Sequence, residues 1–463
     1  MNKSPIPDTI SGRSGAGTQV ERAAEYAARH FRWNFAVLVL DASTFFAGLA
    51  FLESTTVLPV ILHRLGAGDS VIGLARFLQT LGFTLPAILG AHYIHGRRLH
   101  KPFLLATCAI GRAGLLTLPL IFLGLAASAP SAALAWFLIV YAGFWLMDGA
   151  CAVSWFDIVA KTIPVPVRGR FFGVMQMLSG AAAIGTGFAV KVILQRSAFP
   201  LSFALLSSGA CVGVFFSLLF LFAIREPNGT VEDDAVRSRL PEFIRRAFRL
   251  LRESPRLRTL LAIRLLLDGG CMALPFYVLF AEKDLRAGLP MVGVYAVVQS
   301  AGKLCGGPLW GWISDRSGPI AGLRAVALSV AVIPVLALCA SHGVPSLMLA
   351  VFALIGAVQD GVWMVGSTAL LAAVSAEERP LAVGIASVCQ APGSLFGLLG
   401  GALAAATSYP VVFGFALALA AAAVILTCAT ATGSGATGFG PSPSDTTVSA
   451  EAVERSETTA SCR

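Results

Sequence analysis

The chain has 463 residues, of which 56% are hydrophobic and only 13% are charged, whereas soluble domains carry roughly 25% charged residues. So few charges cannot cover the surface of a soluble protein of this length. Composition therefore indicates a membrane protein with many spans and excludes a disordered chain, a collagen, a disulfide scaffold and a soluble enzyme. The net charge of +9 lies in the segments between apolar runs, so we expect no nucleic acid partner.

Twelve apolar segments are long enough to cross a bilayer as helices, which takes about 20 residues. They cover 33–62, 70–95, 102–125, 131–159, 171–194, 200–224, 257–281, 289–313, 320–341, 345–374, 380–406 and 409–430. The predicted fold class is an all-α membrane protein with twelve transmembrane helices in two pseudo-symmetric six-helix bundles.

The segments around the spans divide the chain into five parts. We expect a cytoplasmic N-terminal segment at 1–32, bundles at 33–224 and 257–430, a cytoplasmic linker at 225–256, and a disordered cytoplasmic tail at 431–463. Within the linker, Pro241–Glu253 has the pattern of a basic amphipathic helix lying on the membrane surface.

Lys and Arg residues indicate the orientation. With the N-terminus inside, the cytoplasmic segments hold 23 of them, and the opposite segments hold only Arg64, Arg196, Lys283 and Arg286. This bias follows the positive-inside rule. We predict an integral protein of the bacterial inner membrane, monomeric, with both termini in the cytoplasm.

The two halves share a pattern of residues. Gly73, Gln79 and Gly82 in the second segment recur as Gly293, Gln299 and Gly302 in the eighth. Asp148-Gly149 with Arg168 in the first half matches Asp360-Gly361 with Arg379 in the second. Matches in this order predict a duplicated six-helix unit whose copies have the same orientation in the membrane.

A short motif follows the eighth segment. It reads Gly311-x-x-x-Asp315-Arg316-x-Gly318, and together with twelve segments split six and six by a basic loop it resembles the major facilitator superfamily. The resemblance implies that this loop helps to hold the cytoplasmic side closed through charge pairs, since an Asp at a helix end can bind backbone N–H groups and Arg. The equivalent first-half loop keeps Arg97 and Arg98 but lacks the Asp. The residues predicted to gate are Gly311, Asp315, Arg316, Gly318, Arg97, Arg98, Arg168 and Arg379; a plain positive-inside anchor is the alternative.

Eight ionisable residues lie deep in the apolar segments: Asp41, Asp148, Asp268, Asp360, Arg76, Arg112, Arg264 and Lys303. Each would cost about 2.5–3.5 kcal/mol in contact with lipid, so they must face one another or water. We expect Arg112 to meet Asp148 or Asp41, while Arg264 and Asp268 are one helical turn apart and could form a local pair. Trp155, Trp363 and Gln299 complete the predicted substrate and proton pathway, although aromatic stripes and buried Gln also serve helix packing.

These features predict a secondary active transporter that moves a small organic solute by alternating access. The buried acids predict coupling to protons. Export is slightly favoured over import as the direction of transport. The alternatives are a receptor, scaffold or lipid scramblase without transport activity on the same fold, and a proton-coupled uptake permease. The nine cysteines occur singly, and no GxSxG, HExxH or phosphate-binding loop is present. We therefore expect no enzyme activity, cofactor or metal site.

Overall fold

The computed structural model describes residues 11–94, 97–228, 245, 249–374 and 378–433, and all regular structure in these ranges is helical. The predicted amphipathic helix at 241–253 lies largely outside the described residues, as do the first ten residues and residues 434–463. The N-terminal helices are α1 (Ser11–Ala50), α2 (Val57–Arg64), α3 (Asp69–Ile94), α4 (Lys101–Leu115), α5 (Leu118–Leu125), α6 (Pro130–Thr162), α7 (Val165–Arg196) and α8 (Leu201–Ala223). The C-terminal helices are α10 (Pro255–Gly270), the short 3₁₀ turn η2 (Cys271–Ala273), α11 (Phe276–Lys283), α12 (Met291–Ser317), α13 (Pro319–Ala340), α14 (Leu347–Ala372), α15 (Arg379–Ala406) and α16 (Tyr409–Gly433).

In the described ranges, nine helical segments are long and apolar enough to cross a membrane. Three further helices, α3, α12 and α15, occupy the other three predicted segments with 26, 27 and 28 residues but are not among the nine. All three helices take part in contacts between the two halves, α3 with α15 and α12 with α7. The all-helical membrane fold is confirmed, and the number of twelve spans stays a prediction.

Three predicted segments contain breaks. The segment at 33–62 comprises α1 and α2, the segment at 102–125 comprises α4 and α5, and the segment at 257–281 comprises α10, η2 and α11. Proline explains two of the breaks: α5 has Pro119 in its first turn, and Pro275 directly precedes α11. Proline lacks a backbone N–H and therefore fits at the start of a helix rather than in its interior.

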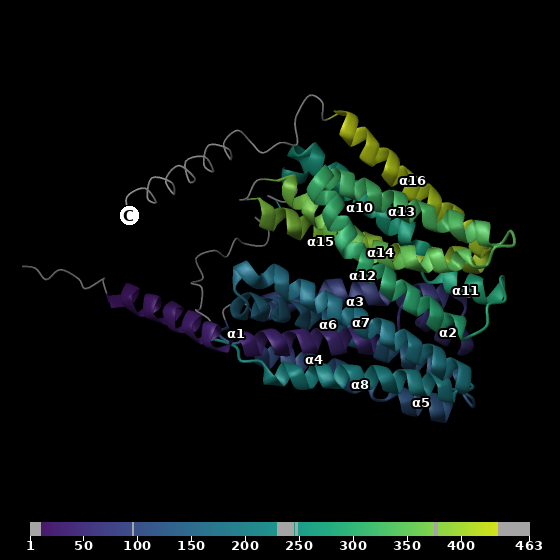
Figure 1. Ribbon diagram of the computed structural model, residues 1–463, viewed down its shortest axis with the longest axis horizontal. Helices are drawn as coiled ribbons and strands as arrows, with labels where there is room; N and C mark the ends of the chain where they lie inside the picture. The colour runs from purple at the N-terminus through teal and green to yellow at the C-terminus, as the bar shows by residue number, and fades with distance from the viewer. Residues whose placement is uncertain (1–10, 95–96, 229–244, 246–248, 375–377, 434–463) are drawn as a thin grey trace, which may run out of the picture.

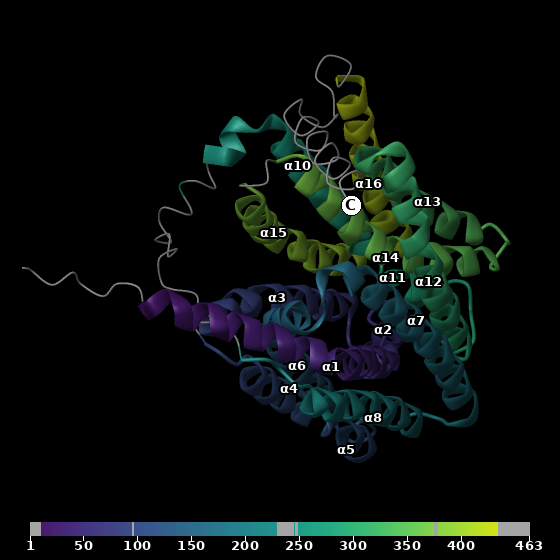
Figure 2. The same cartoon turned by 60° about the vertical axis from the view of Figure 1, so that its left-hand side comes forward.

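The helices form two halves that lie face to face. Figures 1 and 2 show the N-terminal helices α1 to α8 on one side and the C-terminal helices α10 to α16 on the other. The helices at the boundary are α3 and α7 of the first half and α12 and α15 of the second. Helix α3 packs against α15, and α7 packs against α12. The start of α1 and the end of α8 lie at the same end of the molecule (Figure 1), where the side-chain amide of Asn34 exchanges hydrogen bonds of 2.9 Å with the backbone of Arg225.

The recurring glycines have matching packing roles. A Cβ atom at Gly73 would overlap the backbone of Gly397 in the opposite half, and one at Gly293 would overlap the backbone of Lys191 in the opposite half. A Cβ at Gly82 or at Gly302 would instead crowd a helix of the same half, α6 or α14 respectively. This equivalence is what a duplicated unit would produce; the duplication itself stays a prediction.

Candidate functional site

The first group of buried charges lies within the N-terminal half. The Asp41 carboxylate of α1 is 3% exposed and accepts hydrogen bonds from Ser217 Oγ of α8 and, at 2.9 Å, from Trp155 Nε1 of α6. Three helices therefore converge on one carboxylate. Donors of this kind stabilise a buried charged group, which would otherwise be costly.

Arg112 of α4 is the cation of this group. It is 7% exposed, and its guanidinium lies 5.6 Å from the centre of the Phe45 ring. It attracts both Asp41 and Asp148 electrostatically, but among the described residues it forms no ion pair within 4.0 Å, and its Nη1 atom has no hydrogen-bond partner. The N-terminal group thus holds two acids and one base, with an unsatisfied donor.

A second group brings α3 of the N-terminal half to α10 of the C-terminal half. Asp268 lies against the backbone of α15 at Gly393 and is attracted by Arg264 on its own helix and by Arg76 from α3. The Arg76 Nη1 atom also donates a 3.1 Å hydrogen bond to Gln79 Oε1. Neither cation forms an ion pair with Asp268 within 4.0 Å among the described residues, so the attraction acts at longer range.

A third group contains Lys303 of α12 and Asp360 of α14, whose Nζ and Oδ1 atoms are 3.5 Å apart. Each side chain contacts the opposite half: Asp360 Oδ2 accepts a 3.0 Å hydrogen bond from Gln176 of α7, and Lys303 Nζ lies 5.8 Å from the centre of the Phe46 ring of α1. Both charged side chains are 37% exposed. Trp363, one turn after Asp360, is exposed.

Gln299 lies at a contact between the two halves. Its side chain is buried and accepts a 3.0 Å hydrogen bond from Thr55 Oγ1, while its amide nitrogen lies 3.4 Å from Glu53 Oε1. Gln299 therefore joins α12 to the α1–α2 connection, which is the packing role that the sequence left open as an alternative.

The two halves also meet at the end of the molecule that carries α2 and α11. Arg64 Nη2 of α2 binds Glu282 Oε1 of α11 at 2.6 Å. Lys283 Nζ donates a 2.7 Å hydrogen bond to Tyr409 Oη, which in turn donates to Asp69 Oδ1 at 3.0 Å. We call these five residues the outer contact. Sequence reasoning treated Arg64 and Lys283 only as charges on the outer side and missed their partners, which lie 218 and 126 residues away.

His63 borders the outer contact. Burial lowers the pKa of the His63 imidazole below its ordinary value, and the positive charge of Lys283 lowers it further, while Glu282 and Asp69 act in the opposite direction. The described arrangement therefore favours a neutral His63 at this end of the molecule.

The predicted gating motif makes few contacts. Asp315 and Arg316 are exposed; Arg316 lies 5.7 Å from the Trp312 ring centre, and within the described part of the chain Asp315 has no hydrogen-bond or ion-pair partner. Gly318 has a φ of +86°, which only glycine adopts without strain, and it joins α12 to α13. Gly311 has open space around its Cα.

The other predicted gating residues are arranged locally. Arg97 stacks on the Tyr93 ring at 4.0 Å, Arg98 is exposed, and Arg168 donates to the carbonyls of Ala160 and Ile163 at the end of α6. Arg168 therefore stabilises a helix end in the described structure. The side chain of Arg379 lies outside the described residues.

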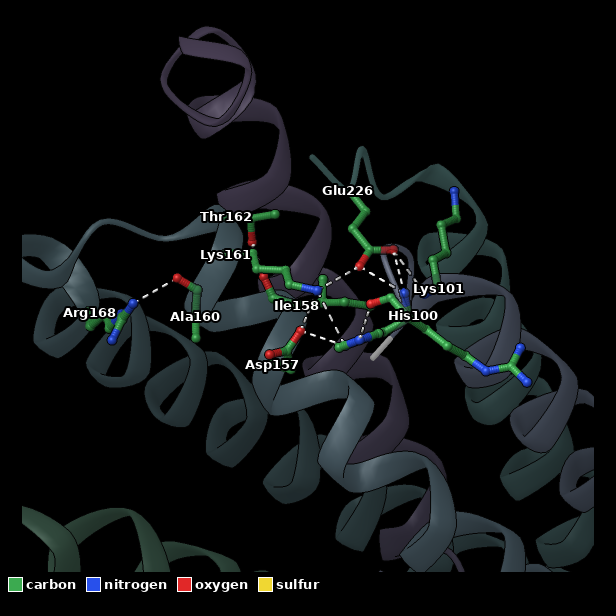
Figure 3. Close-up of polar contacts among 10 residues, drawn as sticks. His100, Lys101, Asp157, Ile158, Ala160, Lys161, Thr162, Arg168 and Glu226 are labelled. Atoms are coloured by element: carbon green, nitrogen blue, oxygen red, sulfur yellow. Dashed lines mark hydrogen bonds and ion pairs between the residues drawn. The ribbon is translucent and has the colours of Figure 1, made fainter. Parts of the chain in front are cut away.

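A polar cluster that sequence reasoning did not find lies where α4 and α6 meet the segment after α8 (Figure 3). Lys161 Nζ lies 2.8 Å from Asp157 Oδ2, 3.4 Å from Glu226 Oε1 and 3.3 Å from His100 Nδ1, and His100 Nδ1 lies 2.6 Å from Asp157 Oδ2. The Glu226 carboxylate also accepts from the backbone N–H groups of His100 and Lys101 at 2.8–3.1 Å, which caps the start of α4. His100, Asp157 and Glu226 are close enough to hold a metal ion, but the Lys161 ammonium lies among them and supplies the positive charge. The only cue in the sequence was the four-residue spacing of Asp157 and Lys161.

Comparisons with known proteins show what the chain is similar to. The family model described as Major Facilitator Superfamily matches residues 265–452. No curated protein sequence matches the chain. Among solved structures, the nucleoside transporter NupG is 17% identical, with a TM-score of 0.63, and the match covers 85% of this chain and 99% of that one. A POT family transporter bound to a thioalcohol-conjugated peptide is 10% identical, with a TM-score of 0.65 and coverage of 87% and 96%. A bacterial homologue of the human lysosomal transporter Spinster, inward-facing and unoccupied, is 14% identical, with a TM-score of 0.57 and coverage of 87% and 94%.

Proposed function

We propose that this chain belongs to the Major Facilitator Superfamily and is a secondary active transporter that moves a small organic solute by alternating access and couples the movement to protons. The two halves would rock about the groups of charged residues between and within them, opening the path to one side of the membrane at a time. The proposed direction is export.

The contrast between the two ends of the molecule carries the proposal. At one end, Arg64, Asp69 and Tyr409 join the halves through the outer contact. At the other, Asp315 is exposed and has no partner among the described residues. Contacts that join the halves at one end, and an Asp315 without a partner among the described residues at the other, support a conformation open towards the cytoplasm, one of the two states that alternating access requires.

The proton coupling rests on the group around Arg112. Asp41 and Asp148 together carry two negative charges against one positive charge, and all three residues lie within the membrane-spanning part of α1, α4 and α6. A net charge of −1 in such a place is costly, and one proton would neutralise it. Uptake of that proton would weaken the attraction between Arg112 and the protonated acid. The group would then have two states that differ by one charge.

The orientation follows from the chain direction and the basic residues. The start of α1 and the end of α8 share one end of the molecule (Figure 1), and Arg97, Arg98 and Arg316 are exposed. We place this end in the cytoplasm of a bacterium, with the outer contact on the opposite side, and treat the protein as a monomer.

The test is transport in proteoliposomes with an imposed pH gradient. Radiolabelled amino acids, dipeptides, nucleosides and sugars would be offered, with protein-free vesicles as the blank. We expect gradient-driven movement of at least one solute, abolished by a protonophore. Asp41→Asn and Asp148→Asn should lose the dependence on the gradient but keep solute exchange, while Asp284→Asn, at an exposed position outside the membrane, should behave as the unmodified protein.

Two outcomes would overturn parts of the proposal. If no solute moves above the blank, the protein is not the transporter that we propose. If solute moves and the gradient still drives it in both Asn variants, the coupling site is wrong while transport stands.

A further inference from the structure

The pair formed by Lys303 and Asp360 differs from Asp41 and Arg112 in its exposure and its neighbours. The two side chains are each 37% exposed, whereas Asp41 and Arg112 are 3% and 7% exposed. A helix-packing pair would be shielded from both sides, as Asp41 is by Ser217 and Trp155. The Lys303–Asp360 pair is open enough for a solute to reach both charges.

The pair also lies between the halves rather than towards lipid. Asp360 binds Gln176 of α7, and Lys303 lies over the Phe46 ring of α1, so both charges face the N-terminal half although both residues belong to the C-terminal half. Phe46, whose ring lies beside Lys303, is 39% exposed, and Trp363, one helical turn after Asp360 on α14, is 61% exposed. A solute at this position would contact both halves at once, as a transported solute must.

The charge balance restricts the class of solute. A solute with a single charge would draw one partner out of the pair and leave the other partly buried without a counter-charge, which is costly. A solute with both a carboxylate and an ammonium group can replace each partner: its carboxylate binds Lys303, and its ammonium binds Asp360 and the Phe46 face. Neither charge is then left alone.

We propose that Lys303 and Asp360, with Phe46, Gln176 and Trp363, form a binding site for a zwitterionic solute with an apolar body. This inference rests on the proposed transport function and names the substrate class for it. The Lys303 ammonium recognises the solute carboxylate, the Asp360 carboxylate recognises the ammonium, and the two aromatic rings contact the apolar part.

The experiment is equilibrium binding to the purified full-length protein, measured with L-phenylalanine and L-alanyl-L-phenylalanine. The comparison ligands are phenethylamine, which lacks the carboxylate, 3-phenylpropionate, which lacks the ammonium, and a neutral nucleoside, uridine. We expect at least one of the two zwitterions to bind about ten- to a hundredfold more tightly than each comparison ligand, as expected for one charged hydrogen bond lost.

Two variants separate recognition from a merely structural pair. Lys303→Gln should lose the preference for L-phenylalanine over phenethylamine, and Asp360→Asn should lose the preference over 3-phenylpropionate. A structural role would weaken all ligands alike. Lys191→Gln is the matched control, since Lys191 of α7 lies against Gly293 of α12, the helix that carries Lys303, and is not part of the site; the preferences of this variant should be unchanged. Thermal unfolding of each variant shows whether it has folded.

Some results overturn the inference and leave the proposed function intact. Equal binding of the zwitterions and the single-charge analogues would do so, as would proton-driven transport of uridine or another solute with no binding of either zwitterion. Absence of any driven transport in the same vesicles would instead remove the proposed function. The two failures are therefore distinguishable.

Discussion

Arg64 on α2 binds Glu282 on α11 at 2.6 Å, and this pair joins the two halves although the residues are 218 positions apart. The Arg64 side chain is 47% exposed, so water screens the interaction. In the proposed transport cycle, the pair would therefore favour the closed state of this end by a modest amount.

The first prediction concerns this pair. Arg64→Ala and Glu282→Gln should each shift the balance towards an open outer end by up to about fivefold, since an exposed ion pair contributes roughly 0.2–1 kcal/mol. Hydrogen exchange of the α2 and α11 amides should become faster by that factor. Arg196→Ala, a basic residue exposed at the end of α7, is the control. The swapped pair R64E/E282R should restore slow exchange; exchange as fast as in the single variants would contradict the role of the pair.

The donors to Asp41 give a second prediction. Trp155→Phe and Ser217→Ala should each lower the free energy of unfolding by about 1–3 kcal/mol, because a buried carboxylate loses one of its two hydrogen bonds. Thermal unfolding in detergent measures the change. The comparison is Trp136→Phe, which removes a hydrogen bond from an exposed Trp to Thr117. A loss in the Trp155 variant no larger than in the Trp136 variant would argue against Asp41 as a buried charged group.

The close helix contacts at Gly73 and Gly293 between the halves give a third prediction. Gly73→Ala and Gly293→Ala place a methyl group against the backbone of the opposite half, so each should cost about 1–3 kcal/mol of stability and slow transport. Gly185→Ala has open space around it and controls for the change in helix propensity. Unchanged unfolding and transport in both the Gly73 and Gly293 variants would mean that α3 does not approach α15, and α7 does not approach α12, this closely.

The outer end should respond to pH through His63. Because burial lowers the pKa of His63 in the closed arrangement, closure favours the neutral imidazole. The stabilisation of the closed state is complete above the ordinary His pKa of about 6.5 and declines as the pH falls below that value, until His63 is protonated in both states. Acid should therefore promote opening of the outer end. Hydrogen exchange of α2 from pH 8 to pH 5 measures this, and His63→Gln should flatten the profile; an unchanged profile in this variant would assign the effect to another group.

The polar cluster around Lys161 gives a fifth prediction. Glu226 is almost fully buried, caps α4 and contacts Lys161, so Glu226→Gln should lower the free energy of unfolding by about 1–3 kcal/mol. Glu25→Gln, at an exposed position on α1, should have no effect beyond about 0.5 kcal/mol. Thermal unfolding of the two variants side by side makes the comparison, and equal values would show that the cluster does not stabilise the fold.

Sequence reasoning could reach the fold because its main signals are local. Apolar runs of membrane length can satisfy their backbone only as helices, and this requirement needs no knowledge of the neighbours. The breaks at Pro119 and Pro275 were less visible, because a proline near the start of a short helix looks the same in sequence as one that kinks a longer helix. The motif ending in Gly318 was found by its resemblance to a family, and the structure adds that its φ of +86° requires glycine there.

The charges in the membrane show where local reasoning ends. The sequence by itself determined that Asp41, Arg112, Lys303 and Asp360 must avoid lipid, because the cost of a bare charge there is set by the solvent. Only the tertiary structure decided that Asp41 is bound by Ser217 and Trp155, which are 176 and 114 residues away. It also decided that Lys303 and Asp360 form a partly exposed ion pair between the halves. The physical reason is that hydrogen bonds and ion pairs act over a few ångströms, and the rotation and register of packed helices, which no single helix encodes, bring the partners within that distance.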